Sequence, residues 1–304
     1  MSHAIEIRRL QYRAGKSFEI PSLDLTVPAG SIYGFLGPNG SGKTTTMRLV
    51  LGLLRPRSGE IRVLDRPMPQ DAHQVLARIG YVPEQPHLDP TLTVGELLRF
   101  QAAFYPTWDH AWATQLLDTF ELDGRRPFGR LSKGQKGKVM MLLALAQRPE
   151  LLVLDEPTDG LDPVVRRDML AALLDYVSEH GATVFISSHL VHELERMCDW
   201  IGVMDQGRLV IELPMDRFKN GIKRLVVSDA PPEVAATPFS LLSRERNGAA
   251  TETWLVRDWE PEMQAFFDSA GGGASLQRVI DLDLEDGFVE LLRTFRTPGA
   301  KEAR

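Results

Sequence analysis

The chain has 304 residues, 43% of them hydrophobic and 25% charged, and its 35 basic and 41 acidic side chains give a formal net charge of −6. These values are ordinary for a globular protein and exclude collagen-like, disordered or strongly basic nucleic-acid-binding chains. A single cysteine, Cys198, excludes a disulfide scaffold. Apolar runs fall far short of the roughly 20 residues that a membrane helix needs. We expect a cytoplasmic protein with one large domain and one smaller domain.

Strand and helix patterns alternate over most of the chain. Short apolar stretches predict strands, which lie within 4–36 and at 60–64, 79–82, 151–154, 183–186 and 200–204. Helical spacing predicts helices at 44–54, 163–179 and 190–198. Strands and helices that alternate in this way favour a parallel α/β sheet. Residues 93–147 have only helical patterns, at 94–105, 108–120 and 134–147, and therefore predict a helical insertion in the sheet.

After Pro214 the pattern changes to that of a small α+β domain. Its strand candidates lie at 223–228, 253–256 and 275–283, and its helix candidates at 261–269 and 285–294, with a flexible turn at 271–273. We therefore predict a large domain over residues 1–214 and an accessory domain over residues 215–304. The accessory domain carries no motif that indicates a chemistry.

A glycine-rich loop joins the predicted strand at 31–36 to the following helix. Residues Gly37–Thr44 match the pattern G-x-x-x-x-G-K-[ST]. Gly40 and Gly42 let the backbone curl so that successive N–H groups point at phosphate oxygens, and the helix N-terminus adds a favourable dipole. Lys43 would reach the β- and γ-phosphates, and Thr44 would offer its hydroxyl to Mg²⁺. The motif in this setting predicts a nucleoside triphosphate site.

A pair of carboxylates, Asp155 and Glu156, ends the apolar strand at 151–154. The carboxyl end of a parallel strand is where ligands bind in open sheets. Asp155 can help to hold Mg²⁺ there, while the neighbouring Glu156 can orient and deprotonate an attacking water. Ser132, with Gly134 nearby, precedes a long apolar helix and is either an ordinary N-cap or part of a second anion site.

These motifs, followed by Ser187–Ser188–His189, resemble over residues 4–214 the ATP-binding subunit of the ATP-binding-cassette (ABC) superfamily. The LSKGQ form of the signature and the ending Asp283–Phe288 are similar to the ABC-2-type exporter group, which moves drugs, antibiotics or lipids. The implied fold is an α/β P-loop NTPase core of the ABC type. It has a mixed sheet and a helical subdomain at about 91–149 and is followed by a small α+β domain.

The resemblance implies a role for each matching residue. Tyr12 would stack on adenine, and the loop residues would bind the nucleotide: Gly37, Pro38, Asn39, Gly40, Ser41, Gly42, Lys43, Thr44 and Thr45. Thr44 and Asp155 would hold Mg²⁺. Glu156 would be the catalytic base, and His189 the switch histidine that touches the γ-phosphate. Asp162 would lie in the loop that faces a second subunit. ATP held by that subunit would contact the signature residues Ser132, Lys133, Gly134 and Gln135.

Two positions depart from the family pattern. A glutamine commonly follows the Tyr-Val-Pro strand, where it binds Mg²⁺ and senses the membrane partner, and here Glu84 comes first with Gln85 next, so either fills this role. Lys133 stands where glycine is commonest. Its charge favours ATP if the side chain faces nucleotide, and the substitution is neutral if the side chain points outward.

The resemblance implies an ATP-hydrolysing subunit that energises a separate transmembrane permease, an exporter, by ATP-driven dimerisation with a second copy or a related chain. Such a subunit lies on the inner face of the cell membrane through its permease. In such subunits, closure of the dimer moves the permease through a docking groove, which the resemblance places near residues 84–105. Aromatic residues there are either part of that surface or ordinary core: Phe100, Phe104, Tyr105 and Trp108. The alternative function is a soluble ABC-type ATPase that acts on a ribosome or nucleic acid. A single cassette without long heptad runs and the net charge of −6 argue against it, so no nucleic-acid partner is expected.

Overall fold

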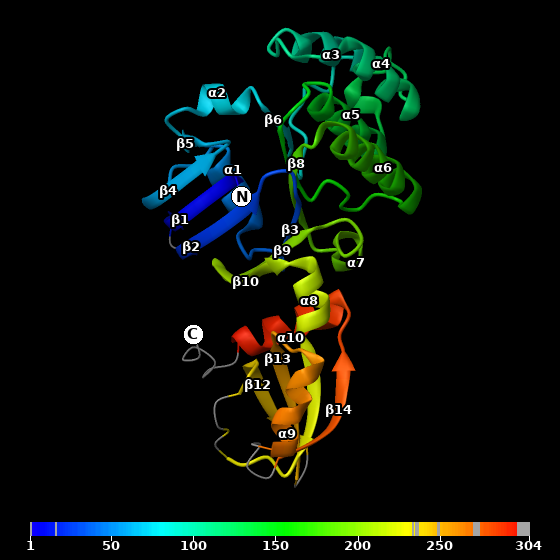
Figure 1. The fold of residues 1–304 in the computed structure, drawn as a ribbon. Coiled ribbons are helices and arrows are strands. Elements are labelled where there is room, and N and C mark those ends of the chain that lie inside the picture. Colours follow the sequence, from blue (N-terminus) through cyan, green and yellow to red (C-terminus); the bar gives the residue numbers. More distant parts are fainter. Residues whose placement is uncertain are drawn as a thin grey trace. The chain divides into compact units, whose positions relative to one another are not determined.

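A computed structural model of the chain describes residues 2–15, 17–232, 234, 237–247, 250–269 and 274–296 (Figure 1). It divides into two compact units, each described separately below. Unit 1 comprises Met1–His189 and Met204–Leu209, and unit 2 comprises Leu190–Val203 and Val210–Arg304. The sequence predicts one domain boundary, after residue 214, whereas each of these units consists of two separate segments of the chain. The boundary after residue 214 remains a prediction.

One sheet of unit 1 is antiparallel, with the strand order β2-β1-β4-β5. Its strands are β1 (His3–Ala14), β2 (Phe18–Pro28), β4 (Ser58–Val63) and β5 (Arg66–Met68). Along β1, Ile5 and Ile7 are buried and Arg8 is exposed, so alternation places the apolar side chains on the core face. The hairpin of β1 and β2 pairs Tyr12 with Ile20.

A second group of strands in unit 1 is parallel and lies in the order β3-β8-β7-β6. These strands are β3 (Ile32–Leu36), β8 (Thr183–Ser188), β7 (Leu151–Asp155) and β6 (Ile79–Val82). Every residue of β3, β7 and β8 is buried, as expected for strands covered on both faces. Because the strands are parallel, their carboxyl ends meet at one edge, where Asp155 pairs in register with Ser187. The strands β9 (Trp200–Asp205) and β10 (Arg208–Pro214) each contain residues of both units.

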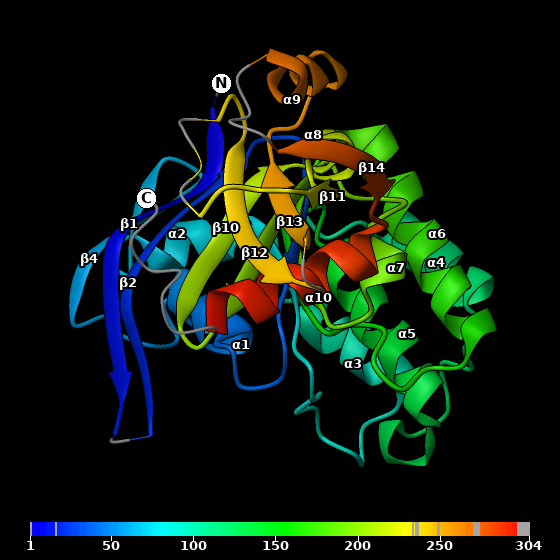
Figure 2. The same cartoon turned by 90° about the horizontal axis from the view of Figure 1, so that it is seen from below.

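The helices of unit 1 follow the predicted order. They are α1 (Lys43–Val50), α2 (Ala72–Leu76), α3 (Val94–Ala102), α4 (His110–Thr119), η1 (Phe128–Arg130), α5 (Lys133–Leu145) and α6 (Pro163–His180). Figure 2 shows α3, α4, α5 and α6 gathered together, away from β1, β2 and β4. The predicted helical insertion is therefore present. Arg148 ties it to the core, because its guanidinium pairs with Asp109 at 2.8 Å and lies 5.1 Å from the ring centre of Trp112.

Unit 2 contains an antiparallel sheet in the order β12-β13-β11-β14. Its elements are α7 (Val191–Leu194), α8 (Met215–Gly221), β11 (Lys223–Ser228), β12 (Ser240–Arg246), β13 (Thr251–Arg257), η2 (Pro261–Gln264), α9 (Ala265–Ser269), β14 (Ser275–Asp281) and α10 (Leu284–Arg296). The α+β class matches the prediction, but β12 is additional to the predicted strands. The turn predicted at 271–273 lies outside the described residues.

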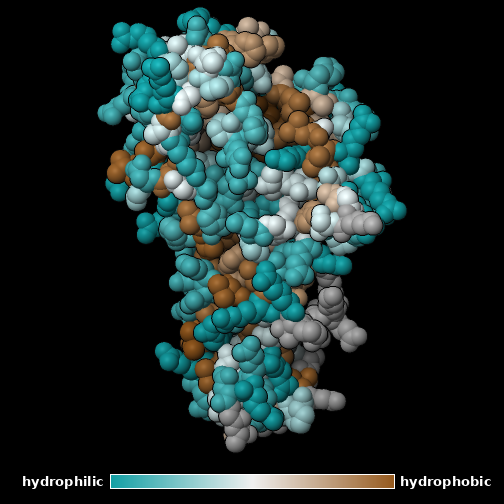
Figure 3. Space-filling model, turned by 180° about the vertical axis from the view of Figure 1, so that it is seen from behind, coloured by the Kyte–Doolittle hydropathy of each residue, from teal (hydrophilic) through white to brown (hydrophobic). Residues whose placement is uncertain are grey.

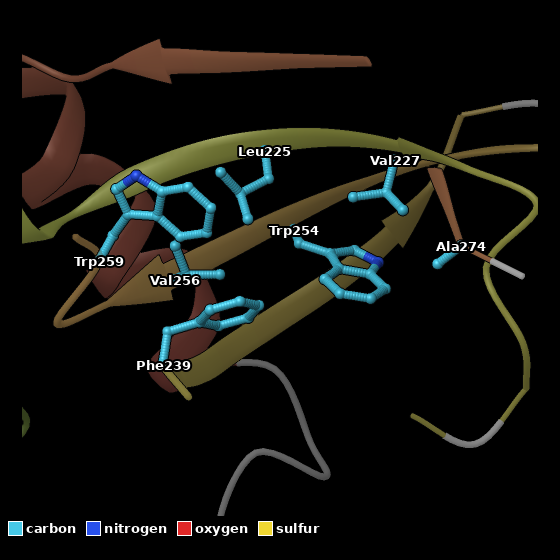
Figure 4. Packing of buried hydrophobic residues seen from close by; sticks show 7 residues of the cluster. All are labelled: Leu225, Val227, Phe239, Trp254, Val256, Trp259 and Ala274. Carbon is cyan, nitrogen blue, oxygen red and sulfur yellow. The ribbon is translucent and has the colours of Figure 1, made fainter. Parts of the chain in front are cut away.

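The core of unit 2 is rich in aromatic side chains. It is formed by Leu225, Val227, Phe239, Trp254, Val256, Trp259 and Ala274 (Figure 4). Phe267 contacts this cluster, with its ring centre 5.8 Å from that of Trp254 and 6.1 Å from that of Phe239. The indole N–H of Trp254 donates to the buried carboxylate of Glu252 at 2.8 Å. Burial acts to raise the pKa of Glu252, but hydrogen bonds from Trp254 and Arg244 outweigh it and lower that pKa.

Apolar side chains on the surface bear on how this chain contacts other molecules. Among the residues that the structure describes, no helix has both the length and the apolar character required to cross a bilayer. Hydrophilic side chains cover most of the face in Figure 3, and apolar side chains gather in several patches on it. On α3 and just after it, Phe100 and Phe104 are 59% and 64% exposed, whereas Trp108 is buried, so the aromatic residues of this region divide between surface and core.

Cys198 provides a test of the packing of unit 2. Its side chain is buried, and burial raises the pKa of the thiol, so both access and thiolate formation are suppressed. We expect iodoacetamide to label the native protein about 100-fold more slowly than the unfolded chain. Intact-mass measurement after timed labelling across a urea series checks this directly, because the sequence contains no other cysteine. Equal labelling rates with and without urea would contradict the buried position.

Candidate nucleotide-binding site

The loop between β3 and α1 has a backbone that only glycine adopts without strain at two positions. Gly40 and Gly42 have φ values of +77° and +115°, and Gly42 is the N-cap of α1. A Cβ on Gly42 would lie 2.7 Å from the ring of Phe18. Residues 37–44 therefore form a tight glycine-dependent turn at the N-terminus of a helix, a setting that favours an anion.

A cavity of about 480 Å³ lies over this loop. It is lined by Phe18, Pro38, Asn39, Gly40, Ser41, Gly42, Lys43, Thr44, Thr45, Glu84 and Glu156. Glu84 and Gln85 both come after the Tyr-Val-Pro strand and are the two candidates for the role of the family's glutamine. Glu84 lines the cavity, whereas Gln85 is not among its lining residues. Tyr12 is also absent from the lining, and the aromatic residue present is Phe18, from the neighbouring strand of the same hairpin.

Lys43 is almost fully buried, with 6% of its surface exposed. Its ammonium donates to the carbonyl oxygen of Gly37 at 2.6 Å and lies 3.2 Å from Oε1 of Glu156. A buried cation is stable only when paired, and here the partners come from the loop and from the end of β7. Lys43 thus links the phosphate loop to Glu156.

Asp155 is fully buried at the end of β7. Its Oδ1 accepts hydrogen bonds from Thr44 at 3.1 Å and from Ser187 at 2.8 Å. Its Oδ2 is also buried and accepts no hydrogen bond from the described residues. Burial raises the pKa of this carboxyl, and the hydrogen bonds from Ser187 and Thr44 oppose that shift. An unpaired carboxylate oxygen beside a hydroxyl is a donor set that suits a hard cation such as Mg²⁺.

Ser187 holds the two carboxylate residues in register. Its hydroxyl donates to Oδ1 of Asp155 and accepts from the backbone N–H of Glu156 at 2.9 Å. Glu156 needs such support, because its φ of +48° lies in the left-handed region that non-glycine residues rarely adopt. The sequence motifs assign no role to Ser187. The available signal was its place at the end of a strand parallel to the one that carries Asp155.

Replacing Ser187 with alanine should impair both the site and the fold. The variant leaves the Glu156 N–H without this acceptor and removes one donor to Asp155, so we expect a loss of about 1–3 kcal/mol in unfolding free energy. We also expect kcat for ATP hydrolysis to fall by about 10-fold as Glu156 loses its fixed position. Steady-state ATPase assays and denaturant titration check both effects. Ser187→Thr keeps the hydroxyl and should recover part of each loss, whereas wild-type kcat in Ser187→Ala would contradict this role.

His189 follows β8 and contacts Glu156 twice. Its ring Nδ1 lies 2.8 Å from Oε2 of Glu156, and its backbone N–H donates to the same oxygen at 3.2 Å. Since Oε1 of Glu156 lies beside Lys43, the carboxylate is held between two nitrogen groups. The structure therefore brings together Lys43, Glu156 and His189, as the motif order predicts.

The signature residues lie outside the cavity lining. Ser132 is the N-cap of α5, where its hydroxyl accepts from the Gln135 N–H at 3.2 Å and its own N–H donates to the Gln135 side chain at 3.1 Å. Asp162 is the N-cap of α6 and accepts from the N–H groups of Val164 and Val165. Both segments are thus fixed as helix starts, with Ser132 and Asp162 exposed.

The sequence matches the family described as "ABC transporter" over residues 20–159. It is 36% identical over 221 residues to the bacitracin transport ATP-binding protein BcrA of Bacillus licheniformis, covering 72% of each chain. It is 33% identical over 300 residues to the Nod factor export ATP-binding protein I of Cupriavidus metallidurans, covering 96% of this chain and 98% of the relative.

The fold has a counterpart among solved structures. A structure described as the ATP-binding subunit of an ABC transporter has a TM-score of 0.64 and 27% identity, and the match covers 71% of this chain and 92% of that chain. This agreement extends the sequence matches to the arrangement of strands and helices around the phosphate loop. The chain belongs to the ABC transporter family, as one of its ATP-hydrolysing subunits.

Proposed function

We propose that this subunit pairs with a second ATP-binding subunit and hydrolyses ATP to drive export through a separate membrane permease. One observation supports this most strongly: a single cavity joins the phosphate loop to Glu156, and His189 contacts that carboxylate. Relatives named for bacitracin transport and Nod factor export favour transport over the alternative of a soluble ATPase that acts on a ribosome or nucleic acid. The subunit then lies on the cytoplasmic face of the membrane, attached to its permease.

Each residue of the cavity has a task in this proposal. The backbone of residues 37–45 binds the phosphates. The ammonium of Lys43 gives up its contact with Glu156 and binds the β- and γ-phosphates. Thr44 and Asp155 would hold Mg²⁺, which neutralises phosphate charge when bound. Glu156 takes a proton from the attacking water, and His189 holds the carboxylate in place. Glu84, rather than Gln85, completes the lining on the side of the β6 strand.

The adenine ring has two candidate partners. Tyr12 remains the partner that the family resemblance implies, while Phe18 is the aromatic side chain that lines the cavity. Stacking on an aromatic ring contributes about 0.5–1.5 kcal/mol, so Phe18→Ala should weaken ATP binding by roughly 3- to 10-fold. Titration with a fluorescent ATP analogue, run in parallel on Tyr12→Ala, separates the two. Unchanged affinity in Phe18→Ala with a loss in Tyr12→Ala would favour the implied partner instead.

The signature supports a shared site. Ser132, Lys133 and Gln135 lie at an exposed helix start away from the cavity of their own chain, where they are available to ATP bound by another subunit. The exposed N-terminus of α5 favours an anion. Two chains, identical or related, would then close on two nucleotides, and closure would move the permease.

The rings of Phe100 and Phe104 form an exposed apolar pair on the helical insertion, with centres 5.0 Å apart. Large apolar side chains exposed together commonly mark a partner surface. We assign this pair to permease contact. The groove predicted near residues 84–105 includes it, and Glu84 at the other end lines the nucleotide cavity.

Co-purification tests the proposal. The C-terminally tagged protein is expressed in its native host and isolated from detergent-solubilised membranes, and mass spectrometry identifies the accompanying chains. We expect a stoichiometric multi-span protein, lost in a Phe100→Ser/Phe104→Ser double variant that still binds ATP. Leu174→Ser, an exposed apolar change on α6, is the matched control and should retain the partner. Recovery only from the soluble fraction with ribosomal or DNA-associated proteins would overturn the transport assignment.

A further inference from the structure

Lys133, the unusual residue of the signature, contacts a residue near the catalytic carboxylate of its own chain. Its ammonium donates to Oδ2 of Asp159 at 3.2 Å. The two side chains are 62% and 43% exposed, so the pair adds little to folding stability by itself. Its importance lies in what else Asp159 contacts.

The other carboxylate oxygen of Asp159 faces the switch histidine. Oδ1 lies 3.7 Å from Nε2 of His189, whose Nδ1 lies 2.8 Å from Glu156. Polar side chains therefore follow one another at separations of 3.7 Å or less from the signature to the phosphate loop, in the order Lys133, Asp159, His189, Glu156 and Lys43. Both ring nitrogens of His189 thus have a carboxylate nearby, Glu156 at hydrogen-bond distance and Asp159 at 3.7 Å, so a change at Asp159 alters the surroundings of the ring directly.

The backbone around Asp159 is shaped to allow this series. The N–H of Asp159 donates to the carbonyl oxygen of Glu156 at 3.2 Å, which turns the chain back toward α5. Gly160 follows in the left-handed region with a φ of +62°, and a Cβ there would collide with the ammonium of Lys133. A glycine at residue 160 thus gives Lys133 room to reach across the turn.

We propose that Lys133 and Asp159 are positioning residues that couple occupancy of the signature to the orientation of His189 and Glu156. The inference rests on the proposed pairing of subunits. Phosphates of ATP on the partner subunit draw the ammonium of Lys133 away from Asp159. The carboxylate of Asp159 then interacts with His189 only and holds the imidazole ring in contact with Glu156. ATP binding at the signature in this way changes the orientation of the hydrolytic residues His189 and Glu156 in the same chain.

A double-mutant cycle on ATP hydrolysis tests the coupling. Lys133→Met and Asp159→Asn are each expected to lower kcat about 5-fold and to reduce the Hill coefficient for ATP toward 1. The double variant should be no worse than either single variant, because both remove the same connection. Binding of a fluorescent ATP analogue to dilute, unpaired chains should stay unchanged in Asp159→Asn. Lys136→Met, one turn further along α5 and placed over the ring of Phe128, is the control and should retain cooperativity.

Two outcomes overturn the coupling and leave the shared site intact. The first is that the losses of kcat in the two single variants add up in the double variant. The second is that Asp159→Asn keeps the wild-type Hill coefficient. In both cases the specific activity of the protein still rises with its concentration, which shows that the chains pair. If the specific activity of the wild-type protein is independent of concentration, the proposed pairing of subunits fails first. The two failures are therefore distinguishable in one series of assays.

Discussion

Glu156→Gln is expected to lower kcat for ATP hydrolysis by roughly 10³-fold while ATP binding persists. General base catalysis commonly contributes 10²–10⁴-fold, and an amide cannot take the proton of the attacking water. The glutamine side chain has nearly the same shape, so the phosphate loop and the contacts around Lys43 should survive. Phosphate-release assays measure kcat, and equilibrium binding of ATP measures the retained affinity.

Two other carboxylates serve as comparisons for Glu156. Glu84 lines the same cavity, and Glu84→Gln should alter hydrolysis far less if its role is to line the site rather than to accept a proton. Glu150 pairs with Arg78 on the surface at 2.6 Å, and Glu150→Gln should behave like the wild type. Equal activity in Glu156→Gln and Glu150→Gln would show that another group accepts the proton.

Trp254→Ala is expected to destabilise unit 2 by about 3–5 kcal/mol, the usual cost of removing a large buried aromatic side chain. Trp254, on β13, is fully buried, and its ring packs against the ring of Phe267. The change also removes the N–H that donates to Glu252 and the ring over which Arg244 lies at 5.2 Å. The midpoint of urea-induced Cys198 labelling measures the loss in unit 2 specifically.

Trp254→Phe is a milder change at the same position. It keeps an aromatic ring but removes the indole N–H and part of the ring volume, so we expect a smaller loss of about 1–3 kcal/mol. A labelling midpoint in Trp254→Ala that equals the wild-type value would contradict the buried core drawn in Figure 4. Identical losses in both variants would assign the effect to what both remove, the indole N–H that donates to Glu252 and the five-membered part of the ring.

Local sequence is sufficient to predict the conformation of the glycine-rich loop and the position of the carboxylate pair at the end of a strand. Glycines at 40 and 42 and the helix that begins at Lys43 determine the loop conformation from neighbouring residues alone. Asp155 and Glu156 follow a fully apolar strand, and the parallel sheet then carries them to the same edge as the loop. The insertion was predictable for the same reason, because its helices have strong local periodicity.

Features that depend on distant residues were not predictable in the same way. Phe18 reaches the cavity only because the β1–β2 hairpin folds back beside the loop, and Ser187 meets Asp155 only through strand register. The edge strand β12 has a sequence, Ser-Leu-Leu-Ser-Arg-Glu-Arg, without clear alternation, and it is ordered by pairing with β13. Likewise, residues 190–203 join unit 2 because α7 packs against α10 and the backbone carbonyl oxygen of Asp199 accepts from the N–H of Met215.

Mixing two inactive variants tests most directly whether each ATP site is built from two chains. Lys43→Ala removes the phosphate-loop lysine, and Ser132→Arg places a bulky side chain at the exposed start of α5, so each should be inactive alone. In a mixed dimer, the intact loop of one chain faces the intact signature of the other. Phosphate release that reappears on mixing is the predicted result. Full activity of Ser132→Arg alone, or a mixture as inactive as its components, would contradict the shared site.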